Sequence, residues 1–276
     1  SYAGLMFLNS FEAVPESFAL SLCPTGMVPM PEDSPYVPVR PEEIAEQVLD
    51  CADLGISSVH LHARGPTAEP AWQRDIFADI ISRIRVERPD LVICVTTSGR
   101  VESAVDKRSD VLQLEGAVKP DMASLTLSSM NFAASASVNA PDTVKELAGI
   151  MRDRSVVPEL EIFDTGMVNY LHYLASKDLV GPPYVVNFIL GGIATAQATP
   201  LDLGHLVERL PADSLWSVGG IGRAQLPSTA MSLAAGGGVR VGLEDNLYFD
   251  SGRTRLATNR ELVTRVLEIG EALGRR

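Results

Sequence analysis

Two of the four histidines of the chain, His60 and His62, lie two residues apart within residues 59–64. A β-strand repeats every two residues, so both imidazoles point to one face while Val59 and Leu61 point to the other. Two imidazoles on one face are suitable ligands for Zn²⁺ or a similar borderline metal. Two polar residues at the solvated end of a strand would give the same pattern, and this segment alone does not decide between the two interpretations.

The bulk composition is that of a globular protein with an acidic balance. The 276 residues are 46% hydrophobic and 21% charged, and the formal net charge is −12. This charge disfavours a nucleic-acid partner, because such a partner requires clustered Lys and Arg. The odd number and wide spacing of Cys23, Cys51 and Cys94 argue against a disulfide framework or a Cys-x-x-Cys metal site and fit a reducing compartment.

No apolar run reaches the roughly 18 residues that are needed to span a bilayer. No Lys- or Arg-rich segment precedes an apolar run near the beginning of the chain, as it would in a signal peptide. We therefore expect a cytoplasmic location and no membrane partner.

Short apolar runs rich in β-forming residues alternate with amphipathic stretches along nearly the whole chain. Eight runs are predicted to be strands, at residues 18–23, 57–62, 91–97, 122–126, 157–163, 184–190, 215–219 and 238–244. The predicted helices occupy residues 41–54, 72–85, 140–152, 167–177, 201–210, 226–235 and 259–273. The segment after Arg100 is shorter and gives a weaker helical pattern.

This alternation predicts parallel strands connected by crossover helices. Eight repeats favour an α/β fold of the single-domain (β/α)₈ TIM barrel type, whose usual length is about 250 residues. A doubly wound open sheet is the alternative, but no Gly-x-Gly-x-x-Gly turn follows the first predicted strand. We predict one domain over residues 1–276, with residues 1–17 as an N-terminal extension and the Pro-rich residues 24–41 as a decoration.

Active sites of TIM barrels lie at the C-terminal ends of the strands, which is where His60 and His62 fall. In the eighth predicted strand the two-residue period puts Arg240 and Glu244 on the inner face. Strands two and eight both neighbour strand one in a closed barrel, so Glu244 can complete a metal site of two histidines and one carboxylate. The alternative is an Arg240–Glu244 ion pair that stabilises the rim.

Other predicted strands also place polar side chains on their inner faces. Thr96 and Ser124 point inward by the same period, and so do Glu159 and Glu161. Buried carboxylates need partners, so Glu161 is expected either to accept a hydrogen bond from a metal ligand or to form a structural ion pair.

The glycine-rich loop 219–223 follows the seventh predicted strand and offers backbone N–H groups together with Arg223. This combination suits an anionic or phosphorylated ligand, and a tight turn with a solvated arginine is the competing interpretation. His172 and His205 lie in predicted helices, which line the outside of this fold, so we expect them on the surface.

Taken together, these segments resemble the β-keto acid cleavage enzyme family, which includes 3-keto-5-aminohexanoate cleavage enzyme. The resemblance extends from about Ala19 to Leu273. The segments that carry it are Pro24-Thr25-Gly26, Pro41-Glu42-Glu43-Ile44-Ala45, residues 59–64, residues 122–125 with Met130-Asn131-Phe132, residues 158–166, residues 216–223 and residues 240–248.

The resemblance implies a Zn²⁺-dependent TIM barrel that condenses a β-keto acid with acetyl-CoA and releases acetoacetate and a new acyl-CoA. It also implies a homo-oligomer, expected to be a tetramer. Carried over by position, the zinc ligands, the catalytic pair and the substrate-contacting hydroxyls fall on His60, His62 and Glu244, on Arg240 and Asp245, and on Thr96 and Ser124.

Two positions depart from the family pattern. In the member that acts on an amino-substituted substrate, an acidic residue of the first loop meets the substrate ammonium, and that position is Val28 here. Met167 stands where many relatives have histidine. A buried ammonium without a carboxylate is costly, so we expect Val28 to line a substrate site for an apolar or uncharged tail without a primary amine.

Three alternatives remain open at this stage. An amidohydrolase would need further histidines at later strand ends, and His172 and His205 do not lie there. A metal-dependent acyl-CoA lyase or hydrolase could use the same barrel without acetyl-CoA as co-substrate. An inactive homologue that only binds a ligand is the third alternative, and a metal-binding assay would distinguish it from the enzymes.

Overall fold

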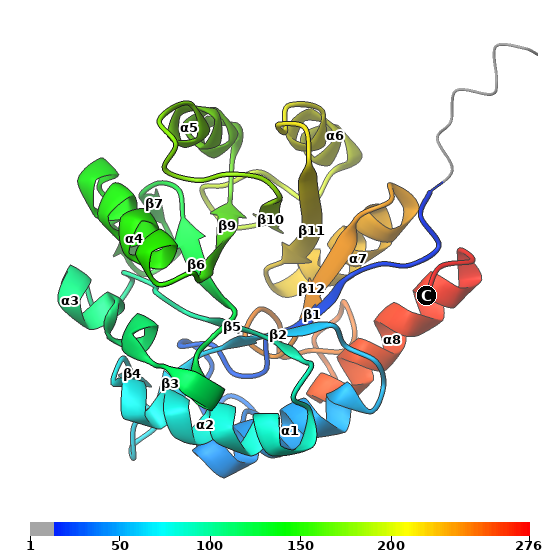
Figure 1. Ribbon diagram of the computed structural model, residues 1–276. Helices are drawn as coiled ribbons and strands as arrows, with labels where there is room; N and C mark the ends of the chain where they lie inside the picture. Colours follow the sequence, from blue (N-terminus) through cyan, green and yellow to red (C-terminus); the bar gives the residue numbers. More distant parts are fainter. Residues whose placement is uncertain (1–13) are drawn as a thin grey trace, which may run out of the picture.

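The computed structural model describes residues 14–276, so residues 1–13 of the expected N-terminal extension lie outside the described part of the chain. Within residues 14–276, eight parallel strands close into a barrel in the order β1-β12-β11-β10-β9-β6-β5-β2, with the helices around it (Figure 1). The barrel strands are β1 (Leu20–Leu22), β2 (Ser58–Leu61), β5 (Val92–Val95), β6 (Met122–Thr126), β9 (Val157–Ile162), β10 (Tyr184–Leu190), β11 (Ser214–Gly220) and β12 (Gly238–Val241). The predicted TIM barrel is thus confirmed.

The helices alternate with the barrel strands as the sequence pattern predicts. They are α1 (Pro41–Ala52), α2 (Arg74–Glu87), α3 (Val105–Arg108), α4 (Pro141–Asp153), α5 (Thr165–Ser176), α6 (Pro200–Glu208), α7 (Gln225–Ala234) and α8 (Asn259–Ala272), with 3₁₀ turns η1 (Asp110–Gln113), η2 (Gly116–Val118) and η3 (Gly222–Ala224). The weak pattern after Arg100 corresponds to the four-residue α3 and two of these turns.

Local chemistry accounts for where several helices begin. Pro41 takes the first position of α1, where its missing N–H costs nothing. The Asp164 side chain accepts the amides of Gly166 and Met167 and so caps α5. Thr258 and Glu261 form a reciprocal capping box at the start of α8.

The core lies between the barrel and its helices. Val59 and Leu61 on β2 are fully buried there, whereas His60 between them points into the barrel. This is the two-residue alternation that the sequence predicts. His172 and His205 are exposed on α5 and α6, as expected.

The eighth strand ends earlier than predicted. Expected to continue to residue 244, β12 ends at Val241, and the amides of Asp245 and Asn246 both donate to the carbonyl of Gly242 to form a turn. A side chain at Gly242 would collide with the carbonyl oxygen of Cys23, so the chain can pass β1 at this point only with glycine. This turn, and not a continuous strand, carries Glu244 and Asp245 to the mouth of the barrel.

Candidate metal centre and substrate cavity

The three predicted metal ligands converge at the C-terminal mouth of the barrel. The Nε2 atoms of His60 and His62 are 3.2 Å apart, and Nε2 of His62 is 3.2 Å from Oε1 of Glu244. Zn–N distances of roughly 2.0–2.1 Å with tetrahedral angles place two ligand nitrogens about 3.3 Å apart. Strand β1 pairs with both β2 and β12, which is why ligands from distant parts of the sequence meet here.

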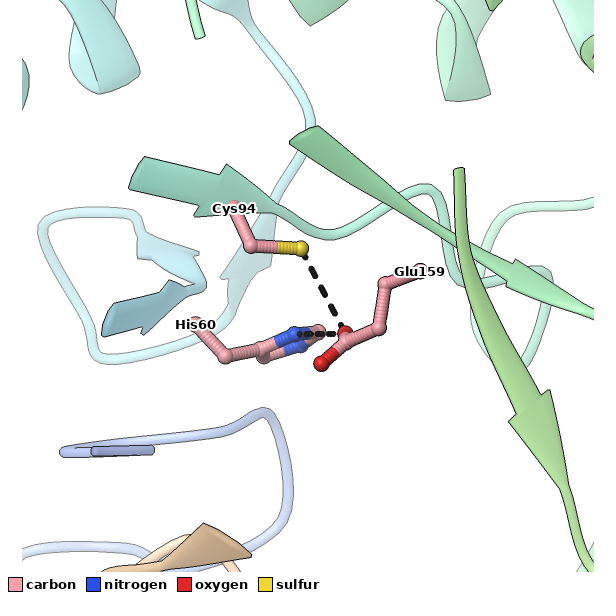
Figure 2. A group of neighbouring side chains, drawn as sticks. All are labelled: His60, Cys94 and Glu159. Carbon is pink, nitrogen blue, oxygen red and sulfur yellow. Dashed lines mark hydrogen bonds and ion pairs between the residues drawn. The ribbon is translucent and has the colours of Figure 1, made fainter. Parts of the chain in front are cut away.

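A carboxylate behind His60 fixes the orientation of its ring. Oε2 of Glu159, on β9, lies 2.9 Å from Nδ1 of His60 and 3.4 Å from the sulfur of Cys94. Figure 2 shows the three side chains pointing toward one another. Because Nδ1–H donates to this carboxylate, the lone pair of His60 lies on Nε2 and faces His62. The acceptor behind the histidine ligand is therefore Glu159.

Of the two contacts expected for Glu161, it forms the ion-pair contact and not the hydrogen bond to a metal ligand. Its carboxylate accepts a hydrogen bond of 2.5 Å from the Thr126 hydroxyl and lies 3.7 Å from Nη1 of Arg240. Burial raises the pKa of Glu161, although His60 and Arg240 oppose that shift. Glu161 is thus part of the charge network around Arg240 and does not contact the histidine rings by hydrogen bonding.

The two interpretations of Glu244 prove compatible, because its two oxygens differ. Oε1 accepts a hydrogen bond from Nη2 of Arg240 at 2.6 Å, whereas Oε2 is buried and has no hydrogen-bond partner within residues 14–276. Burial would raise the pKa of Glu244, but Arg240 and His62 hold it well below its usual value. An ionised carboxylate with a free buried oxygen, next to two imidazoles, fits a divalent cation such as Zn²⁺.

Arg240 and Asp245 form the second half of the site. The guanidinium Nε donates to Oδ2 of Asp245 at 2.9 Å, and the Cys23 thiol donates to the same oxygen at 3.3 Å. Burial disfavours the charge of Arg240, but Asp245 and Glu244 raise its pKa well above its usual value. Nη1 of Arg240 is buried without a hydrogen-bond partner in the described chain, which leaves one donor for a bound molecule.

The first loop is shaped to pack against the metal ligands. Gly26 adopts a left-handed conformation with φ of +61°, and a β-carbon there would overlap Cγ of Glu244. The buried Arg64 fixes this loop by donating to the carbonyl oxygens of Gly26 at 2.8 Å, Pro29 at 2.6 Å and Thr25 at 3.2 Å. Residues 25–29 of the Pro-rich segment are therefore part of the site and not a decoration.

A cavity of about 570 Å³ opens above the cluster and brings most of the predicted site residues together. His62, Thr96, Arg240, Glu244, Asp245 and Val28 all line it. Thr96 lies just beyond the end of β5, and its hydroxyl accepts the amide of Ser98 at 3.1 Å. Val28 is on the rim and about half exposed.

Ser124 and Arg223 lie apart from this cavity. Ser124 is buried in β6, where its hydroxyl accepts the amide of Thr97 at 3.2 Å, and Thr126 two residues further on reaches the cavity wall. Arg223 lines a neighbouring cavity together with Arg253, beyond the loop that follows β11. Arg253 lines both cavities and so stands at their junction.

The fold and the site define an enzyme barrel with a candidate metal centre of two histidines and a glutamate beside a buried arginine–aspartate pair. The family model described as beta-keto acid cleavage enzyme matches residues 18–276, and the chain belongs to this family. The family and the type of enzyme predicted from the sequence are therefore confirmed.

Curated relatives extend over most of the chain. It is 36% identical over 245 residues to a 3-keto-5-aminohexanoate cleavage enzyme of Fusobacterium nucleatum, with 88% of each protein covered. It is 34% identical over 262 residues to a 3-oxoadipate:acetyl-CoA acetyltransferase of Cupriavidus necator, covering 93% of this chain and 89% of that one.

The apo structure of ObcA has a similar fold, with a TM-score of 0.76 at 23% identity over 88% of this chain and 63% of the ObcA chain. Among residues 14–276, no helix combines the length and the apolar character that crossing a membrane would require.

Proposed function

We propose that this enzyme condenses a β-keto acid with acetyl-CoA and releases acetoacetate and a new acyl-CoA, using Zn²⁺ held by His60, His62 and Glu244. The observation that carries the proposal is the shared cavity: the ligand cluster opens into the same space as Arg240 and Asp245. Membership of the family supports the reaction class, and acetyl-CoA is the co-substrate named for the relative from Cupriavidus necator.

The donor set supports zinc through the two facing imidazole nitrogens and the Glu244 carboxylate, whose Oε1 lies 3.2 Å from Nε2 of His62 and whose Oε2 is buried without a partner within residues 14–276. A bound Zn²⁺ would supply Lewis-acid stabilisation of negative charge on a carbonyl oxygen. Glu159 would keep His60 in the tautomer that such binding requires, since it accepts the Nδ1 proton.

We assign the proton transfers to Asp245. Its carboxylate removes a proton from the carbon between the keto group and the carboxylate of the substrate, and that carbon then bonds to the acetyl carbonyl carbon as coenzyme A thiolate departs. The thiolate next bonds to the original keto carbon, the bond between this carbon and its acidic neighbour breaks, and Asp245 returns the proton to that neighbour. The products are acyl-CoA and acetoacetate, so all atoms are accounted for.

Arg240 orients both Asp245 and the substrate. Its Nε and Nη2 hold Asp245 and Glu244, and its Nη1, which makes no hydrogen bond within residues 14–276 and lies 3.7 Å from Glu161, can donate to one carboxylate oxygen of the β-keto acid. Thr96 offers a hydroxyl to the same cavity. We assign Ser124 a supporting role, since it holds the loop after β5 through the Thr97 amide.

The phosphates of acetyl-CoA are assigned to the cavity that Arg223 and Arg253 line. In barrels of this type, phosphate groups frequently bind near the loops after the seventh and eighth strands, which here are β11 and β12. Two arginines at that place supply charge for a phosphorylated partner despite the acidic average of the chain. Val28, which lines the main cavity, offers no carboxylate to an amino-substituted tail.

The direct test incubates zinc-loaded protein with acetyl-CoA and a panel of β-keto acids, and identifies acyl-CoA products by mass spectrometry. We expect a new acyl-CoA and an equal amount of acetoacetate, and the rate at which both form should fall about 100-fold or more with Asp245→Asn. Cleavage of the β-keto acid without acetyl-CoA would instead favour a lyase or hydrolase. Zinc binding without any turnover would favour an inactive binding homologue.

We also propose a homotetramer in the cytoplasm. The tetramer rests on the family resemblance, and mass measurement in solution tests it. The location is supported by the three buried free thiols Cys23, Cys51 and Cys94, which are typical of a reducing compartment. Localisation of the tagged protein in cells of its source tests the second point.

A further inference from the structure

Two arginines that line the main cavity, Arg100 and Arg253, form no ion pair within residues 14–276, and Arg253 is already assigned to the coenzyme phosphates. Arg100 lines the cavity from the loop after β5, and its guanidinium carbon lies 4.0 Å from the centre of the Phe132 ring. Burial lowers the pKa of Arg100, and no carboxylate within residues 14–276 forms an ion pair with it. By contrast, Arg240 in the same cavity is balanced by Glu244 and Asp245.

A second arginine beneath the same loop strengthens this imbalance. Arg108 is buried and donates to two neutral acceptors, the carbonyl of Thr97 at 2.8 Å and the amide oxygen of Asn139 at 2.8 Å. Its Nη1 is buried without a hydrogen-bond partner in the described chain, and the side chain lines a small cavity that shares Ser98 and Met27 with the main one. Glu161 is the carboxylate whose charge acts on Arg108, but neither Arg100 nor Arg108 forms an ion pair within residues 14–276.

The space beside Arg100 suits a short hydrocarbon chain. Met130, Phe132 and Phe163 line the cavity there, and the two phenylalanine rings meet edge to face at 6.1 Å. Stacking on Phe132 holds the guanidinium plane in place, so its outer N–H groups can face a planar carboxylate. Val28 lies near, since its neighbour Met27 contacts Ser98, which in turn accepts the amide of Arg100.

We propose that Arg100 binds a carboxylate at the far end of the substrate tail, so that the preferred substrate is a β-keto acid with a second, terminal carboxylate. The head carboxylate already has a donor in Nη1 of Arg240, which leaves Arg100 for the tail. This inference rests on the proposed function. It keeps the expectation from Val28 that the tail lacks an ammonium, but it replaces the expectation of an uncharged tail by an apolar tail with an anionic end.

The test compares three six-carbon substrates that differ in the charge of the tail: 3-oxoadipate, 3-oxohexanoate and 3-keto-5-aminohexanoate. With zinc-loaded protein and saturating acetyl-CoA, kcat/KM should be highest for 3-oxoadipate, by about tenfold or more over the neutral acid. Arg100→Gln should lower kcat/KM for 3-oxoadipate about 10- to 100-fold and that for 3-oxohexanoate less than about threefold. For Arg100→Lys, kcat/KM for 3-oxoadipate should lie between the values of the unmodified enzyme and Arg100→Gln, because lysine keeps the charge but lacks the planar guanidinium.

Arg253→Gln is the matched control, since it removes another arginine from the lining of the same cavity. It should raise KM for acetyl-CoA and leave the ratio between 3-oxoadipate and 3-oxohexanoate unchanged. If Arg100→Gln instead raises KM for acetyl-CoA and leaves that ratio unchanged, Arg100 binds a coenzyme phosphate and the proposal is wrong. Preference for the neutral or the amino acid by the unmodified enzyme would also refute it.

A binding measurement separates this proposal from the proposed reaction. Titration calorimetry of zinc-loaded protein with adipate and hexanoate reports the effect of a second carboxylate without any turnover. Tighter binding of adipate that Arg100→Gln abolishes supports the anion site even if no β-keto acid is turned over. Equal binding of the two acids, with turnover intact, overturns the anion site and leaves the reaction standing.

Discussion

The sharpest test of the metal centre is to perturb Glu159, which touches no bound ion in our assignment. His60 belongs to two clusters that could hold a metal: one with His62 and Glu244 through Nε2, and one with Cys94 and Glu159 through Nδ1. We assign the metal to the first cluster, because Nδ1 donates to Glu159 at 2.9 Å. Glu159→Gln and Cys94→Ala distinguish these assignments.

The expected magnitude follows from the contacts that each variant removes. Glu159→Gln replaces a charge-assisted hydrogen bond, worth about 1.5–3 kcal/mol, by a neutral one worth about 0.5–1.5 kcal/mol. The difference of about 1–1.5 kcal/mol corresponds to a metal dissociation constant about tenfold higher. Glu159→Ala also leaves the ring without an acceptor, and loss of such a partner costs about 10- to 100-fold in affinity. Cys94→Ala removes only a weak thiol donor and should change the affinity less than about threefold.

The assay is competition for zinc against a chromophoric chelator at fixed pH, with circular dichroism to verify that each variant is folded. Glu161→Gln serves as the matched control, because Glu161 also points into the barrel from β9 but does not contact His60 by hydrogen bonding. The reasoning fails if Cys94→Ala abolishes zinc binding while Glu244→Gln leaves it intact. It also fails if neither substitution at Glu159 changes the affinity.

Three further predictions concern the same centre. Gly26→Ala should weaken zinc binding about tenfold or more, measured by the same competition, because the added methyl group overlaps Glu244 and strains a left-handed backbone; unchanged affinity would contradict the role of the loop. Asp245→Asn should lower kcat about 10²- to 10⁴-fold while zinc still binds, and residual activity above a tenth would exclude Asp245 as the base. The pKa of His60 is raised because Glu244 and Glu159 outweigh the opposing effects of burial and Arg240. In metal-free protein its protonation therefore contributes stability that is complete below the unfolded pKa of 6.5 and is lost as pH rises through the raised folded pKa. Since zinc needs the neutral ring, the gain in Tm on adding zinc should grow from about pH 6 to about pH 8 in scanning fluorimetry; a constant gain would refute this linkage.

The barrel and the face of each strand were predictable because they depend on a two-residue period. That period placed His60 and His62 inside the barrel and left Val59 and Leu61 for the helices. It could not place Asp245, because a continuous strand would have sent it to the face opposite Arg240. The turn at Gly242 brings it back, and the close approach there to Cys23, which is distant in the sequence, leaves no room for a side chain.

The sequence also could not predict how deep Glu159 and Glu161 lie along the barrel axis. The period shows that Glu159 and Glu161 share a face, but the register between strands decides which one reaches His60. In the strand register His60 pairs with Cys94, Cys94 with Met122, and Met122 with Val157. Glu159 is two residues beyond Val157 and Glu161 is four, so Glu159 is the carboxylate nearer to His60. A period of two contains no such information.

Loop residues were the least predictable part of the site. Arg100 and Phe132 belong to different loops without a periodic pattern, so their stacking could not be expected before the fold was known. Arg64 was visible as part of the histidine motif, but its role depends on main-chain carbonyls of residues 25–29.

The hydrogen bonds from Arg64 to the first loop affect how the substrate selectivity of this enzyme can evolve. Arg64 binds main-chain oxygens, which every amino acid possesses, so the path of the loop depends little on the identity of Met27 or Val28. Both side chains nevertheless face the ligand space. Substitutions at Met27 and Val28 can therefore change which acid is accepted at little cost in the free energy of folding. Substrate selectivity can evolve in this way while the backbone stays the same.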